Sequence, residues 1–166
     1  MKLAIYGSSC TGKTTVSNCL AKELALEVRH CGEQIKEAAV RAGSSPDALP
    51  VEQHLLLDSL TRDVVRNAKG GIVVEGAFLD YVLSDVEDCR LVKLVCLDAE
   101  RIRRVVSRGS EHSIAERDAS DVQLAKKLFS GLRAKQPDLQ IDTTTLTPSE
   151  TERCITEWLH RDKIGS

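Results

Sequence analysis

The chain has no hydrophobic run long enough to cross a bilayer and no strong excess of either charge. Its longest uninterrupted apolar stretches are only a few residues, against the roughly 20 that a membrane span needs. The net charge is −2 and the pI is near 6.1, so nothing global points to a nucleic acid polymer or an anionic membrane as partner. The amino terminus leads directly into an apolar strand pattern rather than a signal peptide, and we expect a cytoplasmic protein.

Disulfide and metal-ligand patterns are missing as well. None of the six cysteines forms a C-x-x-C pair, and the four histidines have no metal-ligand spacing. A chain of 166 residues with 42% hydrophobic content can build its core without disulfides, so we interpret most thiols as buried or incidental. Cys10 is the exception of interest, because it lies in the candidate phosphate-binding loop described below.

Apolar strand patterns alternate with amphipathic helix patterns along the whole chain, without internal repeats or low-complexity tracts. This alternation predicts an α/β fold, with a five-stranded parallel sheet and helices on both faces, in one domain spanning 1–166. The expected strands are 3–6, 27–30, 72–76, 91–97 and 139–141. The expected helices are one of about 15 residues after Gly12, then 33–42, 51–69, 98–109, 114–135 and 149–161.

The longest of these helix patterns, 51–69, has a marked apolar side. We expect Leu55, Leu56, Leu60, Val64 and Val65 to face the core, because their spacing places them along one side of a helix. Two consecutive glycines at 70–71 end the pattern.

Residues 7–14, Gly-Ser-Ser-Cys-Thr-Gly-Lys-Thr, fit the phosphate-binding P-loop, G-x-x-x-x-G-K-[ST]. The motif follows the strand at 3–6 and precedes a helix with an apolar stripe of Val16, Leu20 and Leu24, which is the context that a P-loop needs. Its glycines let successive N–H groups point at the β-phosphate, and the helix N-terminus adds positive potential. The sequence therefore predicts a protein that uses a nucleoside triphosphate.

The P-loop pattern also assigns individual roles. Lys13 is predicted to reach the β- and γ-phosphate oxygens as a catalytic residue, and the Thr14 hydroxyl to ligate Mg²⁺. Glu75, at the carboxyl end of a central strand, is a second candidate for Mg²⁺ through water, unless it is an acidic cap or a surface residue. The expected ATP-binding residues are Gly7, Ser8, Ser9, Cys10, Thr11, Gly12, Lys13, Thr14 and Thr15.

Further segments, taken in order, resemble the nucleoside monophosphate kinase family and, within it, most closely the cytidylate kinases. They are Gly32-Glu33-Gln34-Ile35-Lys36, Val73-Val74-Glu75-Gly76, Arg104 with Arg108, Arg117-Asp118-x-x-Asp121, and the stretch 142–148 that leads into the last helix. The resemblance implies a three-layer P-loop kinase fold with a small lid at about 104–121. It also implies ATP and Mg²⁺ as cofactors and a small-molecule acceptor, by default CMP or dCMP.

The same resemblance implies which residues surround the substrates. Arg104 and Arg108 match arginines of the lid helix, and as residues four apart they share one helical face from which they can swing over the γ-phosphate. The alternative for these arginines is a solvated face shared with Arg101 and Arg103. The stretch 142–148 would lie near the adenine. The implied acceptor-binding residues are Glu33, Lys36, Gly76, Arg117 and Asp121.

Three positions at the acceptor end depart from the family pattern. Ala77 stands where an arginine usually follows the strand-end glycine, Lys36 replaces another acceptor arginine, and Leu124 replaces a third. Lysine is a point charge and cannot form the bidentate fork that guanidinium makes with phosphate oxygens. The donor half of the site thus matches the family, whereas the acceptor half is altered.

These departures leave two alternatives open. One is a kinase of a small hydroxyl substrate such as a sugar, a shikimate-like acid or an antibiotic. A hydroxyl acceptor needs a carboxylate within hydrogen-bond reach, for which Glu33, Asp58 and Glu75 are candidates, whereas an ionised monophosphate needs no strong base. The other alternative is a nucleotide-binding regulator with slow NTPase activity.

Overall fold

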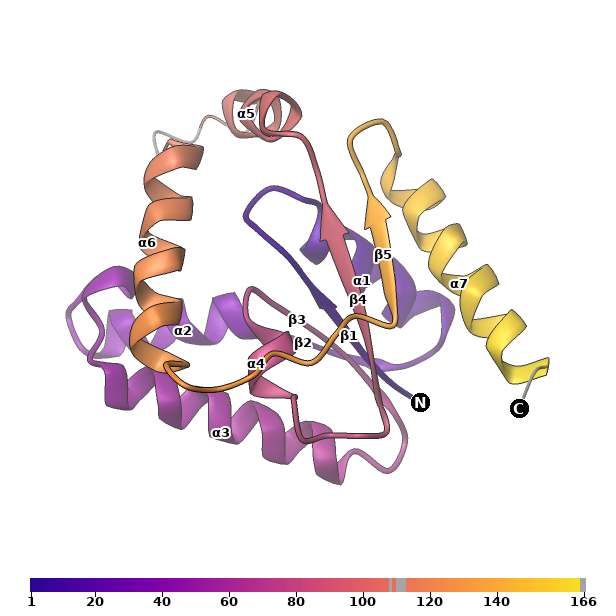
Figure 1. The fold of residues 1–166 in the computed structure, drawn as a ribbon, viewed down its shortest axis with the longest axis horizontal. Coiled ribbons are helices and arrows are strands. Elements are labelled where there is room, and N and C mark those ends of the chain that lie inside the picture. Colours follow the sequence, from indigo (N-terminus) through magenta and orange to yellow (C-terminus); the bar gives the residue numbers. More distant parts are fainter. Residues whose placement is uncertain (108, 110–112, 165–166) are drawn as a thin grey trace.

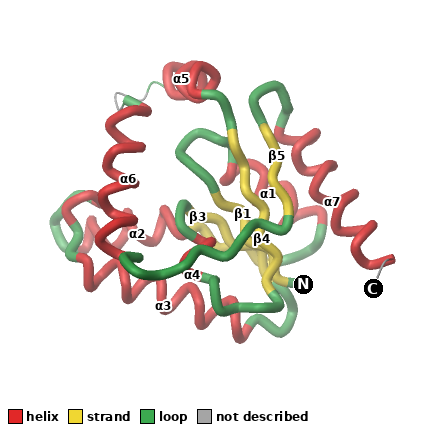
Figure 2. The backbone as a smooth tube through the Cα atoms, viewed as in Figure 1, coloured by secondary structure: helices red, strands yellow, loops and turns green. Residues whose placement is uncertain are grey.

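Five parallel strands form one sheet in the order β2-β3-β1-β4-β5 (Figure 1; Figure 2). The computed structural model describes residues 1–107, 109 and 113–164. The strands are β1 (Lys2–Tyr6), β2 (Glu27–His30), β3 (Ile72–Gly76), β4 (Cys89–Val95) and β5 (Leu139–Asp142). The predicted α/β class and the five-stranded parallel sheet are confirmed, and β4 begins and ends two residues earlier than expected, at 89 and 95 against 91 and 97.

Helices cover both faces of this sheet, as the sequence predicts. One face carries α1 (Lys13–Glu23) and α7 (Pro148–Ile164), and the other carries α3 (Val51–Asn67), α4 (Leu79–Val82) and the end of α6 (Ile114–Leu128). α2 (Cys31–Arg41) and a 3-10 turn (Pro46–Ala48) precede α3, and α5 (Asp98–Ser107) follows β4. Figure 1 shows α5 across the top of the molecule and α6 at its left edge, away from the strands.

The central strand β1 anchors both halves of the core. Leu3 and Ile5 pack on the α1 and α7 side, whereas Ala4 and Tyr6 face the side of α3 and α4. Burying an apolar side chain of this size contributes about 1.5–3 kcal/mol, so a strand buried on both faces is the firmest part of the scaffold. The carboxyl ends of β1, β3 and β4 all open at the same edge of the sheet, where the P-loop begins.

The inward face of α3 differs from the prediction. Leu55, Leu56 and Leu60 are expected in the core, yet they are 45%, 59% and 47% exposed. Val65 is fully buried, and it sets the rotation of the helix, because the residues one and three turns before it lie on the same stripe. The buried positions of α3 are therefore His54, Thr61 and Val65.

α6 is shorter than predicted. It ends at Leu128, and Phe129 then enters the core, where its ring stacks on Tyr81 at 4.8 Å between centroids. The chain turns at Gly131, whose φ is 78°. Lys135, expected at the helix end, lies in the extended segment that follows, and its ammonium donates hydrogen bonds of 3.0 Å to two backbone carbonyl oxygens. The aromatic contact thus ends a helix whose sequence pattern continues.

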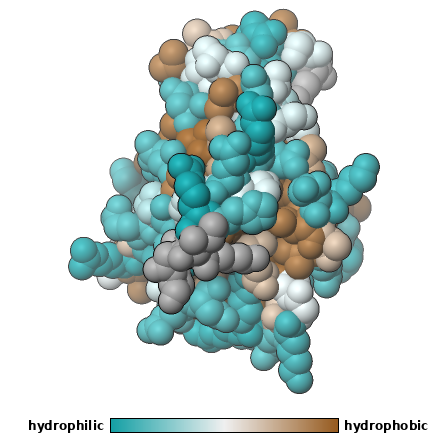
Figure 3. All heavy atoms as spheres, turned by 90° about the vertical axis from the view of Figure 1, so that its right-hand side faces the viewer, coloured by the Kyte–Doolittle hydropathy of each residue, from teal (hydrophilic) through white to brown (hydrophobic). Residues whose placement is uncertain are grey.

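The surface carries scattered apolar side chains. Seen from the α7 side, hydrophilic residues cover most of the molecule, and apolar ones gather only in small areas (Figure 3). Among the described residues, no helix is both long and apolar enough to cross a membrane.

Candidate active site

The P-loop adopts a conformation that depends on its glycines. Gly7 has a φ of 143°, and a Cβ there would collide with the backbone carbonyl of Leu94 on β4. Gly12 has a φ of 98° and precedes α1 without any side-chain cap, so the first N–H groups of the helix have no side-chain acceptor. Cys10 also lies in the left-handed region, with a φ of 63°. A helix start of this kind is a ready site for phosphate oxygens.

Lys13 is the first residue of α1, and its ammonium donates a 2.8 Å hydrogen bond to the carbonyl oxygen of Ser8. Burial lowers the pKa of Lys13, and the carboxylates of Glu75 and Asp121 act in the opposite direction. The guanidinium of Arg117 adds to the lowering. The ammonium predicted to meet the γ-phosphate is therefore surrounded by two carboxylates and one further cation.

Glu75 is buried rather than on the surface, which excludes the surface alternative. Its Oε1 lies 3.3 Å from Nδ1 of His30, and the other ring nitrogen of His30 lies 3.1 Å from Oδ1 of Asn18 on α1. No group of three or more His, Cys, Asp or Glu that could hold a metal occurs in the described part of the chain. Mg²⁺ at phosphate sites usually takes only one or two protein ligands, so the Thr14 hydroxyl and Glu75 fit an ion that arrives with the nucleotide.

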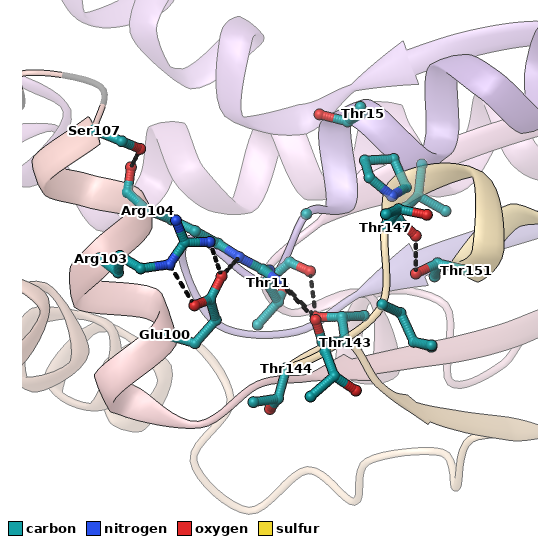
Figure 4. Close-up of a pocket in the computed structure, with 15 residues that line it drawn as sticks. Thr11, Thr15, Glu100, Arg103, Arg104, Ser107, Thr143, Thr144, Thr147 and Thr151 are labelled. Carbon is teal, nitrogen blue, oxygen red and sulfur yellow. Dashed lines mark hydrogen bonds and ion pairs between the residues drawn. The ribbon is translucent and has the colours of Figure 1, made fainter.

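A cavity of about 390 Å³ opens beside the P-loop (Figure 4). Its walls are the loop and start of α1, one side of α5, and the segment 143–151 after β5. A volume in this range is typical of small-molecule sites. The segment at 142–148, which the resemblance places near the adenine, thus lines a pocket adjoining the phosphate loop. Its lining residues include Thr11, Gly12, Thr15, Glu100, Arg103, Arg104, Thr143, Thr144, Leu146 and Thr147.

Arg104 joins two walls of this cavity. Its guanidinium donates hydrogen bonds to the carbonyl oxygen of Thr143 at 2.6 Å and to Oε1 of Glu100 at 2.8 Å (Figure 4). It also donates to the carbonyl oxygen of Cys10 at 3.3 Å. Thr143 in turn donates its hydroxyl to the carbonyl oxygen of Thr11 at 2.9 Å. Arg104 therefore lies at the donor pocket, and its predicted role at the γ-phosphate stays a prediction. Arg108 lies outside the described residues.

Arg101 contacts the P-loop, which its sequence context does not predict, because it lies among arginines that fit a solvated helical face. It is only 4% exposed. Its Nε donates to the carbonyl oxygen of Ser9 in the P-loop at 2.8 Å, and its two terminal nitrogens grip the carboxylate of Asp118 at 2.6 and 2.8 Å. Asp98 accepts a further bond at 2.9 Å. Spacing along α5 gives no signal for this role, since the partners lie far away in the sequence.

The implied acceptor residues divide into two groups. Arg117 and Asp121 lie on α6, and Asp121 interacts electrostatically with Lys13. Burial raises the pKa of Asp121, and the charges of Arg117 and Lys13 partly oppose this. Glu33 and Lys36 are instead exposed on α2, and within the described part of the chain neither forms a hydrogen bond or ion pair with the P-loop.

Two further positions border the acceptor end. Gly76 is buried at the end of β3, where a Cβ would press on Cys31 and Leu79 at 3.2 and 3.3 Å, so the glycine permits close packing there. Asp58, on α3, is only partly exposed, and burial raises its pKa to about 6. The charges of Glu75, Arg117 and Asp121 thus all act on Lys13, and those of Glu75 and Asp58 act on Cys31.

Comparisons with known proteins agree with this architecture. A protein of Thermococcus gammatolerans (strain DSM 15229 / JCM 11827 / EJ3), described as "Putative adenylate kinase", is 27% identical over 165 residues, which are 97% of this chain and 86% of that protein. The solved structure of shikimate kinase from Aquifex aeolicus vf5 has a TM-score of 0.64 and 16% identity, with both chains fully covered. A gluconokinase from Sinorhizobium meliloti 1021 has a TM-score of 0.65 and 13% identity, over 92% of this chain and 87% of its own.

The two solved structures show that this chain shares their fold. The finer resemblance to cytidylate kinases stays a prediction. A family profile described as an AAA domain matches residues 3–124, from β1 through the P-loop to α6. Because this match spans well over half of the chain, the protein belongs to this AAA-domain family and has the P-loop of a kinase-like phosphotransferase.

Proposed function

We propose that the protein transfers the γ-phosphoryl group of ATP to a nucleoside monophosphate, with CMP or dCMP as the default acceptor. The observation that carries the proposal is the electrostatic interaction of Arg117 and Asp121, both on α6, with Lys13 at the start of α1. A monophosphate acceptor needs a cation for its phosphate and a hydrogen-bond acceptor for its sugar or base, and this pair supplies both. The Thermococcus relative, which is described as an adenylate kinase and thus as an enzyme of the nucleoside monophosphate kinase class, adds support.

In this proposal the nucleotide lies across the P-loop. The base of ATP occupies the cavity between α5 and the segment 143–148, and its phosphates meet the N-terminus of α1. Lys13 leaves the carbonyl oxygen of Ser8 for the phosphate oxygens, so a hydrogen bond is exchanged rather than lost. Thr14 and the buried Glu75 would hold Mg²⁺, which would neutralise phosphate charge when bound.

The cations of the site then stabilise the transition state. Charge spreads over the oxygens of the transferring group, so the protein contributes fixed positive charge and little covalent chemistry. Lys13 supplies this charge from the loop. Arg104 and Arg108 supply it from a lid at about 104–121, and Arg117 holds the acceptor phosphate.

A second candidate, transfer to a small alcohol, is favoured by two observations. Ala77 occupies the position where an arginine would bind an acceptor phosphate, so that cation is missing. Burial also raises the pKa of the Asp121 carboxylate, in the direction that suits a general base. The shikimate kinase and gluconokinase that share the fold act, by their names, on hydroxyl compounds. Under this candidate Asp121 accepts the hydroxyl proton.

An ATP-consumption screen, run separately with nucleoside monophosphates and with sugars and hydroxy acids, tests the proposal. Arg117→Ala separates the two candidates further, since it should raise the KM of a monophosphate by about tenfold or more through loss of a charge-assisted contact. The matched control is Arg133→Ala, at an exposed position outside the site. ATP consumption with an alcohol and not with any monophosphate would overturn the lead proposal.

A further inference from the structure

Arg101 is the described side chain that ties the P-loop directly to α6. Its guanidinium bonds the Ser9 carbonyl with Nε and the Asp118 carboxylate with both terminal nitrogens, over distances of 2.6 to 2.8 Å. The paired carboxylate holds the pKa of Arg101 above its usual value, so the cation is permanent. A guanidinium is suited to this double task, because its planar fork engages a carboxylate bidentately while a third nitrogen stays free.

The burial of this arginine means that its bonds hold its position firmly. Its side chain is 5% exposed, whereas that of Arg103, two residues further along α5, is 71% exposed and pairs with Glu100 on its own helix. A buried ion pair costs desolvation free energy on each partner, so it is seldom a net source of stability. The arrangement is better explained by a need for fixed geometry.

Asp118 lies directly next to Arg117 and three residues before Asp121. The backbone of a helix is rigid, so the bonds between Arg101 and Asp118 also fix the backbone positions of Arg117 and Asp121. Among the described residues, this part of α6 is also held by the buried Ile114 in its first turn and by a long hydrogen bond of 3.4 Å from the Ser120 hydroxyl to Asp47, neither of which reaches the P-loop. α6 also lies away from the sheet in Figure 1, so the sheet does not position its amino-terminal half.

We infer that Arg101 is a positioning residue that couples the donor end of the site to the acceptor end. Because of its bond to Ser9, the position of Arg101 depends on the conformation of the phosphate loop. Its bonds to Asp118 then set the position of Arg117 and Asp121 relative to that loop. A nucleotide that orders the P-loop therefore also orders the acceptor-facing half of α6. The inference rests on the proposed function in one respect, namely that Arg117 and Asp121 bind the acceptor.

Hydrogen exchange tests the coupling without any acceptor. The probe is the non-hydrolysable ATP analogue AMP-PNP with Mg²⁺, and the readout is amide exchange in residues 114–124 of the full chain. In the parent protein, binding should slow exchange in this segment by about fivefold or more, because the ordered loop transmits its order through the bonds of Arg101. Arg101→Met should still bind the probe but lose this slowing. Arg153→Met, an exposed arginine on α7, is the matched control and should keep it.

Kinetics provide the second readout. Arg101→Met should raise the acceptor KM or lower kcat by about tenfold while the affinity for AMP-PNP stays within about threefold. Arg101→Lys can hold Ser9 or Asp118 but not both, so its kinetic parameters should lie between those of the parent protein and of Arg101→Met. This variant serves as the test if Arg101→Met does not fold. Unchanged slowing of exchange in a folded Arg101 variant, or an equal loss of nucleotide affinity and acceptor kinetics, would overturn the inference. Absence of turnover by the parent would instead count against the proposed function, and the exchange result would stand.

Discussion

The ammonium of Lys13 lies 2.8 Å from the carbonyl oxygen of Ser8, within the loop that it is expected to serve. Lys13→Ala should reduce kcat/KM by about 10²-fold or more, since a charge aimed at the transferring group is worth most in the transition state. The coupled ATP-consumption rate measures this. Lys22→Ala, an exposed lysine on the same helix, is the control. Equal turnover of the Lys13 variant and the parent would mean that the loop does not carry the chemistry.

Gly7 permits the close approach of the P-loop to β4. Gly7→Ala should destabilise the protein strongly and weaken ATP binding, because the added methyl meets the Leu94 carbonyl. Gly43→Ala is the matched control. Gly43 also has a positive φ, 61°, but open space around it, so it should cost only the backbone strain of about 1–2 kcal/mol. Urea denaturation compares the two, and similar losses at both sites would refute the steric account.

Asp58 predicts a pH dependence of stability. Burial raises its pKa to about 6 in the folded protein from 3.8, so the folded state binds its proton more tightly than the unfolded state does. The sign follows from linkage. The group's contribution is fully present below pH 3.8 and is lost as the pH rises through 6, by up to about 3 kcal/mol.

Asp58→Asn removes that loss. Its free energy of unfolding should exceed that of the parent increasingly as the pH rises from about 4 to about 7. Urea denaturation at several pH values measures the difference, with Asp63→Asn, exposed on the same helix, as control. A difference that is constant with pH, or that shrinks toward pH 7, would contradict the burial of this carboxylate.

Ala77 is half-buried directly after Gly76 at the end of β3. If the acceptor is a monophosphate, Ala77→Arg should lower its KM by about tenfold, corresponding to about 1–2 kcal/mol from a charge-assisted contact. Steady-state kinetics measures this, and Ser84→Arg adds the same charge at an exposed position as control. Should monophosphate kinetics stay unchanged while turnover of an alcohol falls, the acceptor phosphate does not lie beside residue 77.

The sequence predicts features that depend on short local patterns better than features that depend on contacts between distant residues. The P-loop and β2 depend on short patterns, and both lie where the sequence placed them. Of the five residues of α3 expected in the core, Val64 and Val65 do pack there, whereas the three leucines are exposed. The leucines were wrong because their spacing fits a helical stripe as well as that of His54, Thr61 and Val65 does, and only packing decides between the two stripes. The end of α6 was wrong for a similar reason, since the rings that meet Phe129 lie elsewhere in the chain.

The site shows the same division. Lys13 and the threonines near 143 were identified from motifs, whereas Arg101 was not, because its two partners lie in the P-loop and on α6. α5 contains three arginines, and their sequence context does not distinguish a buried arginine that pairs with another helix from one that faces solvent. Burial and bonding separate them only once the helices are packed.

The proposed transfer to a nucleoside monophosphate is tested most directly by identifying the product. The protein is incubated with ATP and Mg²⁺ in one mixture containing CMP, AMP, shikimate and gluconate, and ³¹P NMR follows the phosphorus resonances. The account predicts that nucleoside diphosphate signals from the acceptor appear as ATP is consumed, and that they do not appear with Lys13→Ala. A phosphate ester of an alcohol, or inorganic phosphate as the sole product besides ADP, would contradict it.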